Sequence, residues 1–232
     1  MKALDITKHK THLTNILLDL YKNSTLNPVL GFKGGTAAML FYKLPRFSLD
    51  LDFDLLIPTD EVGDQMTQLL SAKYEIKDNS TKFNTLFWVV SYGSGLAHIK
   101  VEISTRNNPY NHYSLLPFYG VTIKTMDIRD MVAHKLVASM ERISIANRDL
   151  FDIHYFLSSP YAADINYDII RHRTGKEPKD FYISLLKFVS NRDSKRILVG
   201  LGEVLTESQK DWVKGKLIEE LEGLIKKMMH FL

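Results

Sequence analysis

The chain has 232 residues, of which 45% are hydrophobic and 25% charged, and its 30 basic and 27 acidic residues leave a formal net charge of +3. This balance is typical of a globular protein with one large or two small domains and excludes a polycation of the histone kind. The absence of cysteine excludes disulfides, thiolate metal sites and a cysteine nucleophile, and the lack of a long apolar run or signal-peptide core predicts a cytoplasmic protein without a membrane segment.

The first part of the sequence alternates between helical and extended patterns. We expect helices over residues 6–21, 36–42 and 61–71, and strands over residues 29–33, 49–57, 74–77, 85–92 and 98–104, with a hairpin turn at 93–95. These elements predict an α/β (α+β) domain over residues 1–125, built on a mixed sheet with flanking helices.

After the loop at 107–110 the composition shifts to helix, which predicts a helical domain over residues 126–232. Its expected helices cover residues 126 or 127 to 142, 147–158, 178–189 and 207–230. Basic residues gather in one part of this domain, namely Arg171, Arg173, Lys176, Lys179, Lys187, Arg192, Lys195 and Arg196. Such a patch would suit a nucleic-acid backbone, although charge runs on helices are usually solvated faces.

Carboxylates alternate along the strand expected at 49–57. Asp50, Asp52 and Asp54 fall on one face and the apolar residues on the other. Neighbouring carboxylates on that face are about 6–7 Å apart at the backbone, so Asp50 and Asp52 can share one divalent ion. Asp54, about 13 Å from Asp50, is expected outside direct metal contact or facing solvent. The alternative is the wet face of an antiparallel sheet, but Asp is a poor strand former, which favours the metal.

A Gly34-Gly35 pair follows the strand at 29–33, and Thr36 is expected to open the next helix. Such a turn lets backbone N–H groups approach an anion, and the Thr36 hydroxyl can cap the helix or bind phosphate. This pattern favours a triphosphate ligand. Neither the dinucleotide-binding glycine motif nor the P-loop motif is present, which argues against both of those folds.

The strand expected at 98–104 alternates in the same way and can present Glu102 beside Asp50 and Asp52. A third carboxylate is what a two-metal centre needs to hold a second ion and activate a hydroxyl. The alternative is that Glu102 is an ordinary surface residue.

Charged residues also lie near apolar faces in the helical part. Lys135 and Arg142 are seven residues apart on one helix and therefore share a face, and Arg148, Asp149 and Asp152 begin the next helix. These cations can neutralise a triphosphate, with the aspartates orienting them. Ion pairs between packed helices are the alternative.

In order and combination, these segments resemble the AbiEii/AbiGii toxin family, nucleotidyltransferase-like proteins of the DNA polymerase β superfamily. The resemblance runs from residue 30 to 158 and implies a nucleotidyltransferase-type α/β domain followed by a helical one. It makes Asp50, Asp52, Glu102 and Lys135 the catalytic residues, the three carboxylates being the metal ligands. The nucleotide-binding positions that it implies are Lys33, Gly34, Gly35, Thr36, Arg46, Ser48, Lys135, Arg142, Arg148, Asp149 and Asp152.

The same resemblance implies a cytoplasmic toxin with a separately encoded antitoxin, often in phage defence. The expected reaction moves an NMP from an NTP to an acceptor hydroxyl with two Mg²⁺ ions, which Mn²⁺ can replace, and the acceptor is tRNA or another RNA. Two alternatives stay open: a small molecule such as an antibiotic, or a protein side chain, as the acceptor; and a catalytically silent binding module that acts through its antitoxin. The sequence leaves the base of the NTP and the acceptor undetermined.

Overall fold

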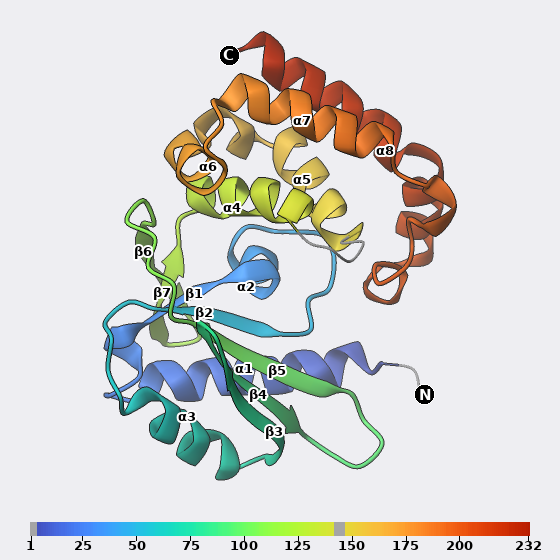
Figure 1. Cartoon of the computed structure of the whole chain (residues 1–232). Coiled ribbons are helices and arrows are strands. Elements are labelled where there is room, and N and C mark those ends of the chain that lie inside the picture. The colour runs from blue at the N-terminus through green and yellow to red at the C-terminus, as the bar shows by residue number, and fades with distance from the viewer. Residues whose placement is uncertain (1–3, 142–146) are drawn as a thin grey trace. The chain divides into compact units, whose positions relative to one another are not determined.

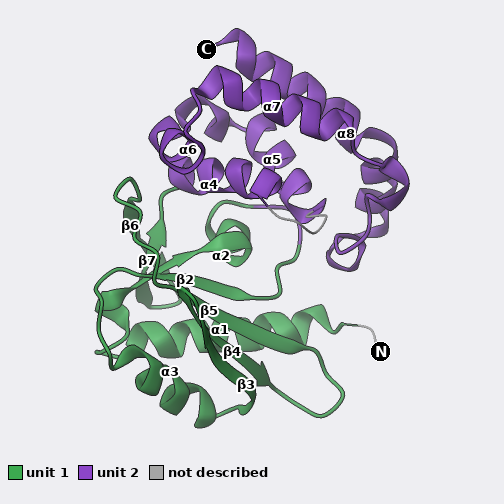
Figure 2. Ribbon diagram, viewed as in Figure 1, with its two compact units in different colours: residues 1–43, 47–127 green, residues 44–46, 128–232 purple. Residues whose placement is uncertain are grey.

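A computed structural model of the chain describes residues 4–141 and 147–232 (Figure 1). Contacts divide the chain into two compact units, which are coloured separately in Figure 2. Unit 1 consists of Met1–Lys43 and Phe47–Asp127, and unit 2 of Leu44–Arg46 and Ile128–Leu232. The sequence places the division near residue 125. In the structure it falls between Asp127 and Ile128, and a short earlier segment also joins unit 2.

Unit 1 is a mixed α/β unit, which confirms the predicted fold class. Its elements are α1 (Ile6–Lys22), β1 (Leu30–Lys33), α2 (Gly34–Phe41), β2 (Leu51–Leu55), α3 (Val62–Ser71), β3 (Glu75–Lys82), β4 (Thr85–Ser91), β5 (His98–Ser104), β6 (Tyr113–Phe118) and β7 (Val121–Met126). Over the described residues the strands form a seven-stranded sheet in the order β3-β4-β5-β2-β1-β7-β6. The pairs β2·β5 and β1·β7 are parallel and the others antiparallel.

Helices bury the apolar face of this sheet. Helix α1 begins at Asp5, whose carboxylate accepts a hydrogen bond from the Lys8 backbone N–H, and buries a stripe at the spacing of an amphipathic helix. Helix α3 covers the sheet where Trp88 donates from its indole N–H to the Thr67 hydroxyl at 3.0 Å. Trp88 lies opposite Val101 on β5. The neighbours of Val101 along this strand, Lys100 and Glu102, therefore point to the other face of the sheet, away from α3.

The β6–β7 hairpin corrects the prediction of helix alone after residue 110. Its turn residues Tyr119 and Gly120 both have positive φ, at 43° and 82°, as the central residues of a type I′ turn do. The usual Asn-Gly or Asp-Gly signal for this turn is missing, and Pro117 makes its segment a poor strand by sequence. Pro117 is tolerated because β6 is the edge strand of the sheet.

Unit 2 is helical over its described residues. It contains α4 (Ile128–Glu141), α5 (Asn147–Ser158), α6 (Tyr167–Thr174), α7 (Pro178–Ser190) and α8 (Glu207–His230). Helix α6 is not among the helices expected from the sequence, although Asn166 caps its start and Gly175 ends it in the left-handed conformation. Helix α8 starts with a capping box between Thr206 and Gln209. In the described part of the chain, we find no helix with the length and apolar character needed to cross a membrane.

Gly31 in β1 is expected to be essential for the stability of unit 1. A Cβ added there would lie 2.4 Å from Cε1 of Tyr113, so the Tyr113 ring packs directly on the glycine. We predict that Gly31→Ala lowers the free energy of unfolding by about 1–3 kcal/mol through overpacking, as measured by urea unfolding. The control is Gly63→Ala in α3, where an added Cβ meets nothing within 4 Å. This change should raise stability by about 0.5–1 kcal/mol, and an equal effect at both positions would contradict the prediction.

Candidate active site

Two carboxylates lie side by side on adjacent parallel strands, on the same face of the sheet. Asp52 in β2 is the register partner of Glu102 in β5, and both are half-buried. Asp50 lies just before β2, because the strand begins at Leu51 rather than at the predicted residue 49. Asp50 and Asp52 therefore do not belong to one regular strand, and of these two residues the strand pairing places Asp52 beside Glu102. We call Asp50, Asp52 and Glu102 the carboxylate site.

The glycine turn touches this site directly. Gly34 has a φ of 80°, and a Cβ added to it would lie 2.2 Å from Oδ2 of Asp52. Any other residue at position 34 would meet both a strained backbone and the carboxylate itself. The Asp52 side chain is thus packed against the backbone that opens α2, and the N-terminal end of a helix favours negative charge.

Thr36 has a different place from the one that its sequence position predicts. Helix α2 begins at Gly34 with Lys33 as its N-cap, so Thr36 lies inside the first turn and is not the cap. Its side chain is fully buried, and its hydroxyl donates a hydrogen bond to the backbone carbonyl of Asp50. In this structure the hydroxyl therefore holds the main chain of the carboxylate site. Gly35 follows in the same turn and is also buried.

Asp54 is not solvent-facing, which corrects that expectation. It is 5% exposed, and its two carboxylate oxygens accept from Lys33 Nζ at 2.5 Å and from the Tyr113 hydroxyl at 2.6 Å. Tyr113 reaches Asp54 across Gly31, the register partner of Asp54 in β1. The charge of Lys33, predicted to bind nucleotide, is thus paired inside unit 1. Ser48 is buried just before the carboxylate site.

The chemistry of the carboxylate site suits a magnesium ion that arrives with a substrate. Within the described residues, no three His, Asp or Glu side chains are grouped closely enough to hold a metal ion. Mg²⁺ prefers oxygen ligands in an octahedron and is usually held by one or two carboxylates together with substrate phosphates and water. The opposed pair Asp52 and Glu102, beside a turn that can take phosphate, fits such a partial ligand set.

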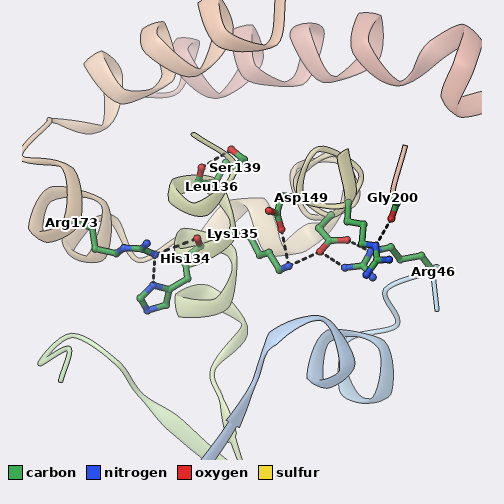
Figure 3. Close-up of polar contacts among 10 residues, drawn as sticks. Arg46, His134, Lys135, Leu136, Ser139, Asp149, Arg173 and Gly200 are labelled. Carbon is green, nitrogen blue, oxygen red and sulfur yellow. Dashed lines mark hydrogen bonds and ion pairs between the residues drawn. The ribbon is translucent and has the colours of Figure 1, made fainter. Parts of the chain in front are cut away.

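Four of the other predicted residues, Arg46, Lys135, Asp149 and Asp152, belong to unit 2 and form an ionic cluster (Figure 3). Arg46 binds Asp152 in a bidentate pair, with Nε 2.5 Å from Oδ1 and Nη2 2.7 Å from Oδ2. The Lys135 ammonium lies 2.8 Å from Asp152 Oδ2 and 3.0 Å from Asp149 Oδ1. The side chains are buried, and Lys135, the most exposed of the four, is 13% exposed.

Within the described residues, two positive and two negative groups of the cluster face one another. Burial alone would raise the pKa of Asp152, but the charges of Arg46 and Lys135 outweigh it and hold that pKa below its ordinary value of 3.8. Burial likewise opposes the charge on Lys135, and Asp152 and Asp149 overcome it and raise the pKa of Lys135. The geometry is that of an ion pair between packed helices, the alternative that the sequence left open.

The remaining cations of unit 2 are mostly engaged as well. Arg148 donates to the Gly200 carbonyl and pairs with Glu203 at 2.9 Å, while the predicted Arg142 lies outside the described residues. Within the basic segment, Arg171 pairs with Asp168 and Glu177 at 3.0 and 2.9 Å. Arg173 pairs with Glu141, and it also contacts Nδ1 of His134 at 2.9 Å, as Figure 3 shows. Part of the positive charge that the sequence counts is therefore used inside the protein.

Comparison with known proteins identifies the family. The family model described as nucleotidyl transferase AbiEii toxin, Type IV toxin–antitoxin system, matches residues 15–216. The chain belongs to this family. AbiEii proteins are thus nucleotidyltransferase toxins, and a Type IV system implies an antitoxin partner. Among curated proteins, none matches the chain.

Solved structures share the fold of this AbiEii protein. An inferred nucleotidyltransferase from H. pylori has a TM-score of 0.69 at 21% identity, over 98% of this chain and 96% of that one. JHP933 from Helicobacter pylori has a TM-score of 0.64 at 20% identity, over 99% and 95%. An antigenic nucleotidyltransferase-like protein from Paracoccidioides brasiliensis has a TM-score of 0.50 at 15% identity, over 87% and 97%.

Two residues of the AbiEii chain that hold the site were missed by sequence reasoning. Tyr113 lies on a strand that was not predicted, so its bond to Asp54 could not be anticipated. His9, on α1, donates from Nε2 to the Leu49 carbonyl at 2.9 Å, directly before Asp50. Gly31 carried a usable signal, because a glycine inside a strand often marks the close approach of another group. His9 lies on the buried face of its helix and carried no such signal.

Asp152 is expected to stabilise the fold of the AbiEii chain strongly. Asp152→Ala leaves the buried Arg46 guanidinium without its bidentate partner, and we predict a loss of about 3–5 kcal/mol in the free energy of unfolding at pH 7. Removal of the exposed partner of Arg148 by Glu203→Ala should cost less than about 1 kcal/mol. Urea unfolding measures both values, and equal losses would contradict the assignment.

The loss caused by Asp152→Ala is also expected to depend on pH. Because the folded pKa of Asp152 lies below its ordinary value of 3.8, the ionised carboxylate stabilises the fold above that pH. The stabilisation is lost as the pH falls through the lowered folded pKa. The difference in unfolding free energy between wild type and Asp152→Ala should therefore be constant from pH 7 to 5 and shrink below about pH 4.

Proposed function

We propose that this AbiEii chain is a magnesium-dependent enzyme that transfers an NMP from an NTP to an acceptor hydroxyl. We further propose that it acts in the cytoplasm as a toxin in phage defence, and that a separately encoded antitoxin controls it. The observation that carries this proposal is the pairing of Asp52 with Glu102, with the backbone of Gly34 packed against Asp52. Carboxylates for a metal and a turn for phosphates meet there on one segment of unit 1.

In the proposed reaction, the acceptor oxygen forms a bond to the α-phosphorus while the bond from that phosphorus to the bridging oxygen breaks. Pyrophosphate leaves, and the acceptor proton passes to solvent. Asp52 and Glu102 would hold Mg²⁺ together with substrate phosphates, Asp50 would join them once the nucleotide is bound, and Mn²⁺ would be a substitute. An ion bound there would supply positive charge for the phosphates and would lower the pKa of the acceptor hydroxyl. The turn at Gly34-Gly35 receives phosphate oxygens at the start of α2.

The role proposed for Lys135 and Arg46 is to compensate the charge of the leaving pyrophosphate. Both are engaged with Asp152 in the ionic cluster, so this role requires the cluster to share its cations with the nucleotide. We propose tRNA or another RNA as the acceptor, supported by the basic residues at 171–196. Lys179, Lys187 and Lys195 in that segment are exposed at the surface of unit 2.

Loss of Asp52 is expected to abolish transfer without unfolding the protein. The assay contains Mg²⁺, each α-labelled NTP in turn and total tRNA, and measures label on RNA and on protein. Asp52→Asn should lower incorporation at least about 100-fold, since charge stabilisation by the metal supplies several kcal/mol to such reactions. The matched control is Asp78→Asn, the same change at an exposed position on β3, and it should leave incorporation unchanged.

The outcomes of this assay separate the candidate functions. Label on RNA that disappears in Asp52→Asn supports an RNA nucleotidyltransferase and names its nucleotide. Label on protein supports transfer to a side chain. Absence of label anywhere favours a small-molecule acceptor if Mg²⁺ with an NTP still raises the unfolding temperature, and a silent binding module if it does not.

Gly34→Ala tests the contact between the turn and the carboxylate. The added Cβ would displace the Asp52 carboxylate, and we expect about a 10- to 100-fold loss of transfer, the size of effect that a 1 Å misplacement produces. Gly120→Ala is a matched control, because Gly120 has a φ of 82° and an added Cβ there meets nothing within 4 Å. Both variants carry the strain of a positive φ, about 1–2 kcal/mol, so equal activity in the two would contradict this contact's importance.

A further inference from the structure

His9 is a fully buried histidine that has no part in the proposed reaction. It lies on α1, whose other buried side chains include the aliphatic series Leu13, Ile16, Leu17 and Leu20. Its Nε2 lies 2.9 Å from the Leu49 carbonyl oxygen and its Nδ1 lies 2.8 Å from the Tyr92 hydroxyl. Both ring nitrogens are therefore bonded inside unit 1.

The partners define the direction of these hydrogen bonds. A backbone carbonyl only accepts, so Nε2 carries the hydrogen and donates to Leu49. In the neutral ring Nδ1 then accepts from the Tyr92 hydroxyl. Burial lowers the pKa of His9, which favours this neutral form. Tyr92 therefore donates to His9, and His9 in turn donates to the Leu49 carbonyl.

Tyr92 is itself held in place. The His12 ring, one turn along α1, stacks on Tyr92 with the ring centroids 4.5 Å apart, and it packs edge-on against Tyr74. The His9 ring meets Phe47 edge-on at 5.7 Å. His9 therefore has little freedom to rotate away from the Leu49 carbonyl.

The two hydrogen bonds from His9 and Thr36 fall on either side of one residue. The Leu49 carbonyl belongs to the peptide plane before Asp50, and the Asp50 carbonyl, which accepts from Thr36, belongs to the plane after it. With both planes held, the two soft backbone dihedrals of Asp50 are fixed, and so is the direction of its Cα–Cβ bond. Asp50 also precedes the first register pair of β2 with β5, which begins at Leu51. The side chains of His9 and Thr36 provide a constraint there that the strand pairing does not.

We propose that His9 is a positioning residue, which together with Thr36 orients Asp50 for its role in the carboxylate site. This inference rests on the proposed function for its catalytic consequence, while its structural part concerns the backbone of Asp50 alone. An apolar side chain would fill the same space on α1 without the cost of burying an imidazole. The presence of a histidine at this position is explained by its hydrogen bond to the Leu49 carbonyl, which it holds in place.

Three variants test this role. His9→Phe keeps a planar ring and removes both hydrogen bonds, whereas His9→Gln keeps an N–H group that can donate to the Leu49 carbonyl. Leu17→Ala makes a cavity on the buried face of the same helix without touching Leu49, and so reports the effect of lost stability alone.

The first readout is amide hydrogen exchange at Asp50 and Leu51, followed by NMR. We expect exchange about 10-fold faster in His9→Phe and close to wild type in His9→Gln and Leu17→Ala, once it is compared at equal global stability. The second is the affinity for Mn²⁺ with each α,β-methylene NTP in turn, followed by electron paramagnetic resonance. The third is transfer at saturating NTP, where kcat should fall about 10- to 100-fold in His9→Phe and less than about fivefold in His9→Gln.

The outcomes distinguish this inference from the proposed function. Unchanged exchange at Asp50 in His9→Phe would overturn the role of His9, whatever the activity. Equal loss of kcat in His9→Phe and Leu17→Ala would also overturn it, because both losses would then come from stability. Wild-type protein that neither binds Mn²⁺ with an NTP nor transfers label would overturn the proposed function, and exchange at Asp50 would still decide whether His9 fixes its backbone.

Discussion

The carboxylate site depends on the parallel pairing of β2 with β5. This register puts Asp52 opposite Glu102, and like charges in directly opposed positions weaken a sheet. The pairing is enforced from the other face, where Leu51, Val101 and Trp88 are register partners and all three are buried. A slip of one residue would turn these apolar side chains to the polar face. Burial of the apolar face therefore holds the two carboxylates together, and a cation bound beside both of them would favour the same pairing.

Two glycines in and after β1 let other groups reach this polar face. Gly31 leaves room for the Tyr113 ring, and Gly34 leaves room for the Asp52 carboxylate. The aspartates of β2 thereby receive different surroundings. Asp54 is neutralised inside the protein by Lys33 and hydrogen-bonded by Tyr113, whereas Asp52 adjoins the start of a helix, where anions are favoured. Residues of one type at neighbouring positions thus become a structural ion pair in one case and a candidate ligand in the other.

In the ionic cluster of unit 2, buried charged groups are likewise paired with groups of opposite charge. A carboxylate as buried as Asp152 is tolerated because two cations and good geometry offset its desolvation. One of those cations, Arg46, comes from the short segment Leu44–Arg46, which belongs to unit 2 although the chain on both sides of it belongs to unit 1. The bidentate pair fixes that segment shortly before the chain enters the carboxylate site. A sequence that resembles nucleotide-binding motifs therefore also supplies structural ion pairs.

The sequence by itself determined the mixed fold, most of the helices and strands, the turn at Gly34-Gly35 and the face shared by Asp52 and Glu102. Each of these follows from periodicity or local backbone preference, which are properties of neighbouring residues. Tertiary structure alone decided that Asp54 is paired with Lys33, that Lys135 is enclosed by two aspartates, and that His9 and Thr36 hold the main chain around Asp50. The partner of a charge or a carbonyl lies far away along the chain, as Tyr113 does from Asp54 at a separation of 59 residues. A sequence displays which groups carry charge or hydrogen, but only packing determines which of them meet, and therefore which are left to act on a ligand.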